Sequence, residues 1–368
     1  MRLLHVVPTY LPARRYGGPI VAVHGLCKAL AARGHEVKVL TTSVDGDGTL
    51  DVPPSVTMDG VEVRYCASPF PRLYWSPEMR RALETEVPNA DLVHSHAVYL
   101  WPGVAAARRA RRHRVPYVIT PRGMLVPELI RAKSRAAKTL WLRLVERRAL
   151  AGAAAIHFTS RLEWDDAKRT GVPLPSPFVV PNGVDVPPRP DVARDERMLL
   201  FLGRINWKKG LDRAIEALPP DAHLVIAGND EEQLTPKLQA LAQQRGVAAR
   251  VTFPGAVYGA AKDELLARAA LFVLPSRSEN FGNAVLEALA METPVVLSSE
   301  VGLADDVVRA DAGVVGLERV GELLADGARR AQMGRNGRTL VESRFTWERV
   351  AQQMEEAYSC SIRSHRSS

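Results

Sequence analysis

Two stretches in the second half of the chain carry residue types that suit one binding site. The first covers residues 203–210 and reads GRINWKKG, with cations at Arg204 and Lys209. The second covers residues 278–287 and reads SENFGNAVLE, with carboxylates at Glu279 and Glu287. Fixed cations suit phosphate groups, and carboxylates accept hydrogen bonds from hydroxyl groups. The set predicts a site for an anionic diphosphate joined to a polyhydroxyl sugar.

Both stretches follow predicted strands, at residues 198–202 and 271–274. Ligands of open parallel sheets bind at the carboxyl ends of the strands, so the two stretches are expected to share one edge. A helix is predicted from about Asn283 to residue 291. Glycine at 282 lets the backbone approach a ligand, and the amides of the first helical turn attract an anion. We therefore add to the predicted site Asn280, Phe281, Gly282 and Asn283.

Simpler interpretations exist for each stretch alone. Residues 203–210 also fit an ordinary loop with solvated cations, and the two glutamates also fit a hydrolase with paired carboxylates. Neither interpretation explains why Arg204 and Lys209 are predicted at the same sheet edge as Glu279 and Glu287.

Short apolar runs alternate with longer helical patterns along the whole chain. Helices are predicted at residues 20–33, 134–151, 232–245 and 260–270. Unbroken apolar strands separated by helices indicate parallel sheets covered on both faces, here as two Rossmann-like lobes of the α/β class. The predicted strands are 3–7, 36–41, 61–65, 91–94, 117–120, 155–158, 178–180, 198–202, 223–227, 251–254, 271–274, 295–298 and 313–315.

The chain has 368 residues, which is too long for one ordinary hydrophobic core. The proline-rich run at 186–191 disfavours helix and central strand and lies near mid-chain. We predict a first domain at 1–186 and a second at 187–345. A crossover helix at 346–360 places Trp347, Val350, Met354 and Tyr358 on one face, and residues 361–368 are expected to be disordered.

Composition narrows the class and the location of the protein. Hydrophobic residues make up 46% of the chain, and lysine plus arginine exceed aspartate plus glutamate by 49 − 41 = 8. Three cysteines without CxxC spacing disfavour disulfide frameworks and zinc modules. The first residues predict a strand rather than a signal peptide, and no run approaches the roughly 20 apolar residues of a membrane span. A cytoplasmic protein is therefore expected.

The order of several motifs resembles a known family. Glu279 and Glu287 with seven residues between them, and Gly203-Arg204 with Lys209-Gly210, are similar to motifs of the retaining GT-B glycosyltransferases of family 4. The resemblance covers nearly the whole chain. Its other segments are Gly17-Gly18, Leu30 with residues 33–37, residues 181–185 (PNGVD) and residues 345–347 (FTW).

The resemblance implies a GT-B fold, in which two lobes face each other across a cleft and the C-terminal helix crosses back to the first lobe. It implies a retaining enzyme that uses a nucleoside-diphosphate sugar without a metal or other cofactor. Arg204, Lys209 and the helix start after Gly282 would stabilise the leaving diphosphate, and Glu279 would orient the sugar. The expected acceptor is a glycan or lipid-linked acceptor of bacterial surface polysaccharide synthesis, such as exopolysaccharide or lipopolysaccharide.

In the first half, the resemblance places Gly17 and Gly18 opposite the donor phosphate. His94 and His96 would lie on one face of a strand, which suits a metal pair, but no third ligand is within sequence reach. The resemblance implies that His96 hydrogen-bonds a hydroxyl of the donor sugar. His94 is expected either to support the site from behind or to lie in the core. Arg122 follows another strand and would contact acceptor or donor phosphate; a purely structural loop is the alternative.

Three further interpretations remain open. Asp45 and Asp47 form the DxD pattern of metal-dependent glycosyltransferases, although their surroundings predict a solvent-exposed turn. A sugar-nucleotide epimerase of the same fold would need acid and base carboxylates and no acceptor groove. A non-catalytic basic binding protein would need none of the site residues. A dehydrogenase is disfavoured, because no GxGxxG follows a strand.

Basic residues gather in two segments of the first half. The second segment interleaves them with Leu140, Trp141, Leu142 and Leu144, which predicts a cationic amphipathic stretch. Such a stretch suits peripheral binding to the anionic inner face of the plasma membrane, and a solvated arginine-rich face is the alternative. Nucleic acid is not an expected partner, because no aromatic stacking surface accompanies the cations. The cations are Arg108, Arg109, Arg111, Arg112 and Arg114, then Arg131, Lys133, Arg135, Lys138, Arg143, Arg147 and Arg148.

Overall fold

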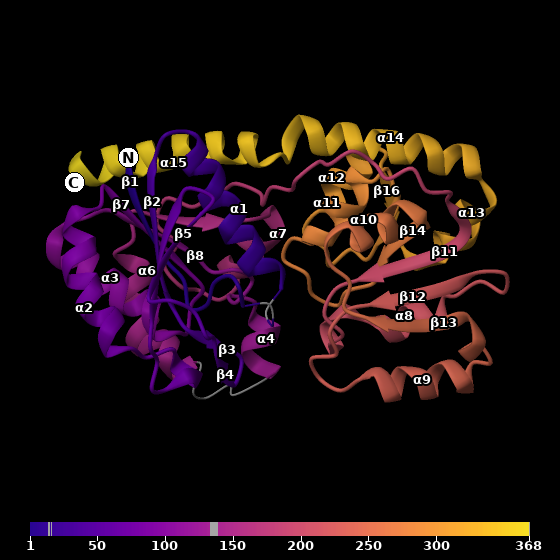
Figure 1. Ribbon diagram of the computed structural model, residues 1–368, viewed down its shortest axis with the longest axis horizontal. Helices are drawn as coiled ribbons and strands as arrows, with labels where there is room; N and C mark the ends of the chain where they lie inside the picture. The colour runs from indigo at the N-terminus through magenta and orange to yellow at the C-terminus, as the bar shows by residue number, and fades with distance from the viewer. Residues whose placement is uncertain (14, 16, 133–138, 368) are drawn as a thin grey trace. The chain divides into compact units, whose positions relative to one another are not determined.

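The computed structural model describes residues 1–13, 15, 17–132 and 139–367 (Figure 1). The chain forms two compact units, and each contains a parallel sheet with helices. Unit 1 holds residues 1–182 and the C-terminal segment from Trp347, and unit 2 holds Gly183–Thr346. The predicted α/β class with two Rossmann-like lobes is confirmed.

The sheet of unit 1 has eight strands in the order β10-β9-β8-β7-β1-β2-β6-β5. All neighbours pair in parallel except β5 and β6, which pair antiparallel. The central strands are almost wholly buried because helices cover both faces. The strands are β1 (Arg2–Val6), β2 (Glu36–Thr42), β5 (Ser55–Met58), β6 (Val61–Cys66), β7 (Leu92–His96), β8 (Tyr117–Thr120), β9 (Ala155–Phe158) and β10 (Phe178–Val179).

A short hairpin of β3 (Val44–Asp45) and β4 (Gly48–Thr49) was not predicted as a strand pair. Its turn carries Asp47, whose side chain is 94% exposed, which agrees with the predicted solvent-exposed turn. The predicted helix 134–151 begins outside the described residues. Its described end is a π-helix (Leu142–Glu146) followed by α6 (Arg147–Ala151). The other helices of the unit are α1 (Gly18–Ala32), α2 (Pro77–Glu86), α3 (Trp101–His113), α4 (Pro127–Ala132) and α7 (Arg161–Lys168).

The last helix, α15 (Trp347–Ser367), returns to unit 1 as the resemblance implied. Gly25 of α1 has no room for a Cβ, because the Trp347 indole occupies that space. Arg33 Nη2 forms an ion pair with Glu355 at 2.7 Å. The predicted disordered tail is wrong for residues 361–367. Ser361 is buried and Ile362 packs on the core of unit 1, and these contacts stabilise the last turns of the helix.

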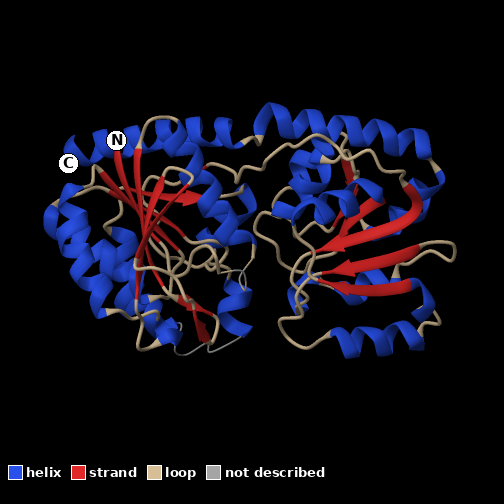
Figure 2. Cartoon of the chain, viewed as in Figure 1, coloured by secondary structure: helices blue, strands red, loops and turns tan. Residues whose placement is uncertain are grey.

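Unit 2 contains a wholly parallel sheet in the order β13-β12-β11-β14-β15-β16, with helices on both faces (Figure 2). All six residues of β14 are buried, as expected for a central strand of a parallel sheet. The strands are β11 (Asp195–Leu202), β12 (His223–Ala227), β13 (Val251–Gly255), β14 (Ala269–Leu274), β15 (Val295–Leu297) and β16 (Gly313–Val315). The helices are α8 (Leu211–Glu216), α9 (Thr235–Gln244), α10 (Gly259–Arg268), α11 (Asn283–Ala290), α12 (Ala304–Arg309), α13 (Val320–Ala325) and α14 (Gly327–Arg344).

Within the described part of the chain, no helix combines the length and the apolar character that a bilayer crossing requires.

Candidate functional site

In unit 2, glycines let three loops meet at the carboxyl edge of the sheet. A Cβ on Gly228, after β12, would overlap the carbonyl oxygen of Gly203, after β11. A Cβ on Gly210 would overlap the carbonyl oxygen of Pro275, after β14. Because both neighbours are backbone atoms, only glycine permits these approaches. The glycines therefore fix the spacing between the loops that carry the predicted site residues.

Gly210→Ala is expected to lower the free energy of unfolding by about 2 kcal/mol or more, through left-handed strain plus overpacking. Gly210 has a φ of 60°, and the added methyl group meets the Pro275 backbone. Gly246→Ala is the matched control: its φ is 68°, but nothing lies within 4 Å of the new Cβ. Urea denaturation of both variants measures the difference. Equal losses would show that the loop contact does not constrain the fold.

The predicted cations of unit 2 are held by carboxylates. The Nζ of Lys209 forms an ion pair with the Glu279 carboxylate, and the two side chains are only 18% and 15% exposed. Arg204 Nη1 donates to Glu231 Oε1 at 2.8 Å. Asn206 Nδ2 donates to the other oxygen of Glu231 at 2.9 Å, so Glu231 orients both residues. Glu231 was not predicted.

The loop after β14 is fixed by its backbone. The Glu279 amide donates to the Glu300 carbonyl, and the Glu279 carbonyl accepts from the Gly302 amide, both at 2.9 Å. Gly282 precedes α11 with a φ of 102° and offers no side chain to cap the first turn. The first-turn amides of α11, which begins at Asn283, are thereby presented at the same loop as Glu279.

Two predicted residues of this stretch have contacts that the sequence did not reveal. Glu287 Oε1 accepts from Lys262 Nζ of α10 at 2.9 Å. Phe281 is 2% exposed and packs edge-on against Phe345 in the core. The prediction that Phe281 binds the donor is therefore corrected for its side chain, which is fully used in packing.

In unit 1, the loops at the carboxyl edge bring His96 and Arg122 together. Arg122 has a φ of 56°; its Nη1 donates to Asn182 Oδ1 at 2.8 Å and its Nη2 lies 3.3 Å from His96 Nδ1. A guanidinium cannot accept a hydrogen bond, so Nδ1 of His96 accepts and its proton sits on Nε2. Burial, followed by the Arg122 charge, holds the pKa of His96 well below its usual value and keeps the ring neutral.

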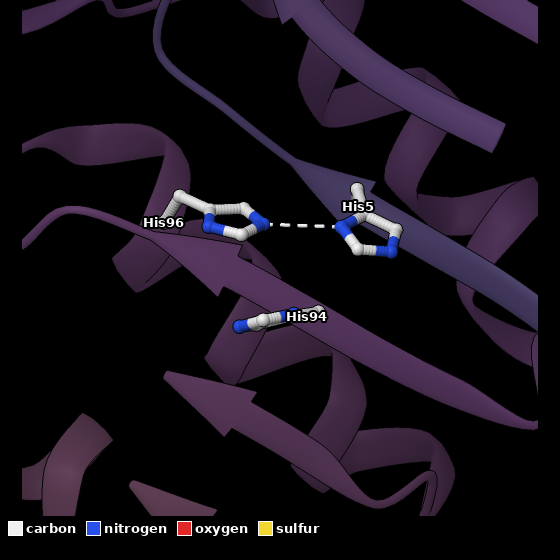
Figure 3. Close-up of side chains that lie close together, drawn as sticks. All are labelled: His5, His94 and His96. Carbon is white, nitrogen blue, oxygen red and sulfur yellow. Dashed lines mark hydrogen bonds between the residues drawn. The ribbon is translucent and has the colours of Figure 1, made fainter. Parts of the chain in front are cut away.

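His96 Nε2, at the end of β7, then donates to Nδ1 of His5 on the neighbouring strand β1 at 3.0 Å (Figure 3). His5 therefore carries its proton on Nε2. That atom is buried and has no hydrogen-bond partner among the described residues. Gly17 and Gly18, at the start of α1, belong to the same unit, and Gly17 has a φ of 59°.

A directed hydrogen-bond chain runs through the other histidines of unit 1. His157 Nε2 donates to the Val180 carbonyl at 2.8 Å, so its Nδ1 accepts from Thr120, also at 2.8 Å. Thr120 in turn accepts from His94 Nε2, and His94 Nδ1 accepts from the Tyr358 hydroxyl, both at 2.6 Å. This hydrogen-bond chain ties α15 to Val180, just after β10, through strands β7, β8 and β9.

Sequence spacing offered His94 and His96 as a metal pair with no third ligand in sequence reach, and the fold brings His5 of β1 beside them. The donor atoms of His5, His94 and His96 lie within 4.8 Å of one another. However, both nitrogens of His94 already bond hydroxyl groups. The nearby Arg122 charge also opposes a second cation. The residues therefore fit a hydrogen-bonded network better than a metal centre.

The two basic segments of unit 1 differ in how far the structure describes them and in whether their cations are paired. Arg109 of the first segment forms an ion pair with Glu84 and is 12% exposed, so this cation is partly structural. Part of the second segment, including Lys133, Arg135 and Lys138, lies outside the described residues. Of its apolar residues, Leu140 and Leu144 are 58% and 61% exposed.

The chain is similar to known proteins over nearly its whole length. Residues 187–340 match the family "Glycosyl transferases group 1", and residues 17–183 match "Glycosyl transferase 4-like domain". A D-inositol 3-phosphate glycosyltransferase of Xylanimonas cellulosilytica is 30% identical, covering 93% of this chain and 91% of that protein. The sucrose-phosphate synthase of Thermosynechococcus elongatus superposes with a TM-score of 0.76 at 22% identity, covering 98% of both chains. Anabaena HepE in complex with UDP superposes with a TM-score of 0.73 at 20% identity, covering 98% of this chain and 100% of that one.

Proposed function

We propose a specific reaction for this chain, which belongs to the group 1 glycosyl transferases and is a glycosyltransferase. It moves a hexosyl sugar from a nucleoside-diphosphate donor to a glycan or lipid-linked acceptor, with retention of anomeric configuration and without a metal. The single observation that carries the proposal is the Lys209–Glu279 pair beside the start of α11. A cation, a carboxylate and helix amides together match a sugar diphosphate.

In this proposal, binding of the donor replaces ion pairs within the protein by contacts between the protein and the donor. As the anomeric bond breaks, negative charge grows on the leaving diphosphate, and preorganised cations and dipoles stabilise it. Lys209, Arg204 and the first-turn amides of α11 fill this role, with the donor phosphates replacing Glu279 and Glu231 as partners of the cations. Glu279, released from Lys209, then orients the sugar. HepE was solved with UDP, which supports a nucleotide donor for this chain.

Unit 1 supplies the sugar and acceptor contacts in this proposal. Neutral His96 exchanges its hydrogen bond with His5 for one with a hydroxyl of the donor sugar, while Arg122 holds the ring in place. Gly17 and Gly18 allow close approach of the donor phosphate. The acceptor belongs to bacterial surface polysaccharide synthesis at the inner face of the membrane, where the exposed Leu140 and Leu144 fit a peripheral contact.

A donor and acceptor panel tests the reaction. UDP- and GDP-sugars are incubated with and without EDTA, with soluble glycans, D-inositol 3-phosphate, or lipid-linked sugars in anionic vesicles. Nucleoside diphosphate release that requires an acceptor and survives EDTA is expected, with retained configuration in the product NMR spectrum. Interconversion of donor sugars without an acceptor would establish the epimerase alternative. Strict dependence on Mg²⁺ or Mn²⁺ would overturn the metal-free mechanism.

A further inference from the structure

Unit 2 contains a second charged site, a cavity of about 250 Å³ at the opposite edge of the sheet. Arg189 and Arg194 precede strand β11, and Glu292 precedes β15, so the cavity lies at the amino edge. The donor loops follow β11 and β14, at the carboxyl edge of the same sheet. The cavity is lined by Arg189, Arg194, Glu196, Glu292, Gly327, Arg330, Ala331 and Arg335.

Positive charge exceeds negative charge in this cavity. Its lining contains four arginines and two glutamates, a formal difference of 4 − 2 = +2. Glu196, which pairs with Arg330, is itself 59% exposed, so solvent weakens its compensation of the arginines. Burial, followed by the Arg189 charge, lowers the pKa of Arg194 from its ordinary value. A further anion would relieve this excess.

Arg330 is the most deeply buried of the cations. It is 3% exposed, and its Nη1 donates to the carbonyls of Leu323 and Leu324 at the end of α13. Its Nε is buried and has no hydrogen-bond partner in the described parts of the chain. A buried guanidinium with an unused donor is costly unless a ligand or water satisfies it.

Other arginines of the cavity retain donors as well. Among the described contacts, Arg194 donates once, from Nη2 to the Glu292 carbonyl at 2.9 Å. Arg335 is exposed and donates once, from Nη2 to Gln332 Oε1 at 2.6 Å. A guanidinium has five N–H groups, so both can bind an oxyanion without losing these contacts.

The N-terminus of α14 adds to the positive potential. Gly327 and Ala331 of its first turns line the cavity, and the helix is 18 residues long. Asp326 caps only the Arg329 amide within the described contacts. The dipole of a long helix and a set of arginines favour the same kind of ligand.

We propose that this cavity binds a small phosphorylated anion, either inorganic phosphate or a phosphate monoester of sugar size. Arginine forks match phosphate oxygens in bidentate geometry. The volume is below the roughly 300–1,000 Å³ of pockets for drug-sized ligands, which favours a small anion. Arg189 and Arg194 also donate to the carbonyls of Met291 and Glu292 after α11. The cavity therefore lies at the far end of the helix whose first turn belongs to the donor site.

Isothermal titration with inorganic phosphate tests the proposal. Because the donor loops also suit phosphate, all titrations use protein carrying Lys209→Ala. The cavity variant adds Arg194→Gln and Arg335→Gln. The control adds Arg309→Gln and Arg329→Gln, which remove the same charge from exposed positions of the same unit outside the cavity lining.

Phosphate is expected to bind the Lys209→Ala protein and the control equally, and at least tenfold more weakly to the cavity variant. Equal affinity in the cavity variant, or no phosphate binding to the Lys209→Ala protein, would overturn the proposal. Circular dichroism checks folding, and the single Arg335→Gln variant, at an exposed position, serves if the double variant unfolds. Because no turnover is measured, the result is independent of the proposed reaction. Glucose 6-phosphate then replaces phosphate to distinguish the free ion from a monoester.

Discussion

Lys209→Ala is expected to lower kcat about 10²–10³-fold, the loss typical of removing one preorganised group that stabilises a developing anion. Lys209 is 18% exposed and sits beside the loop that starts α11, so little solvent screens its charge. The effect should appear in kcat at saturating donor, because the leaving diphosphate gains charge as the bond breaks. Initial rates of nucleoside diphosphate release measure it.

Glu279 complicates this experiment, because removing Lys209 leaves its carboxylate unpaired and able to repel the donor. The double variant Lys209→Ala/Glu279→Gln separates repulsion from the loss of the cation, and it should stay as slow as Lys209→Ala. Lys237→Ala, an exposed lysine on α9, is the matched control and should keep the original kcat. Recovery of the rate in the double variant, or a normal rate in Lys209→Ala, would remove Lys209 from the catalytic group.

The parallel core was predictable because its strands are simple apolar runs. The predicted bounds of β8, β9, β12 and β16 agree with the structure. The strands that were missed, such as β5 (SVTM), are short, partly exposed edge strands without a clear apolar pattern. Edge strands owe their conformation to a neighbouring strand rather than to their own side chains, so local pattern gives little signal.

The sequence allowed prediction of those site residues that lie in loops directly after parallel strands, because such loops meet at one edge of the sheet. Lys209 and Glu279 were placed together on that basis, and the structure shows their ion pair. Glu231, which pairs with Arg204, and Lys262, which pairs with Glu287, lie in a loop and a helix whose orientation depends on packing. His5 was missed because β1 and β7 are neighbours only once the strand order is known. Their histidines are 91 positions apart in the chain.

The buried histidines predict that unit 1 loses stability in mild acid. The pKa values of His5 and His157 are both lowered to about 3, mainly because the rings are buried and next because of the Arg122 charge. In the unfolded chain the pKa of a histidine is about 6.5. Between these values the unfolded state binds protons that the folded state does not. The free energy of unfolding is therefore complete above about pH 6.5 and falls as the pH drops toward about 3.

Each such histidine contributes about 1.4 kcal/mol per pH unit to this loss. The pKa values of His94 and His96 are shifted in the same direction, so the combined slope is several-fold steeper. Since whole domains are stable by only about 5–15 kcal/mol, unit 1 is expected to unfold within about two to three pH units below 6.5. Urea denaturation followed at half-unit pH steps measures the slope.

His157→Gln isolates one member of the network. Glutamine can accept from Thr120 and donate to the Val180 carbonyl, but it does not titrate. The slope between pH 5 and 6 should become shallower by about 1.4 kcal/mol per pH unit. His113→Gln, at an exposed position at the end of α3, is the control for replacing a histidine outside the buried network. An unchanged slope in His157→Gln would mean that the folded protein protonates this ring, and the neutral chain from Tyr358 to Val180 would then be wrong.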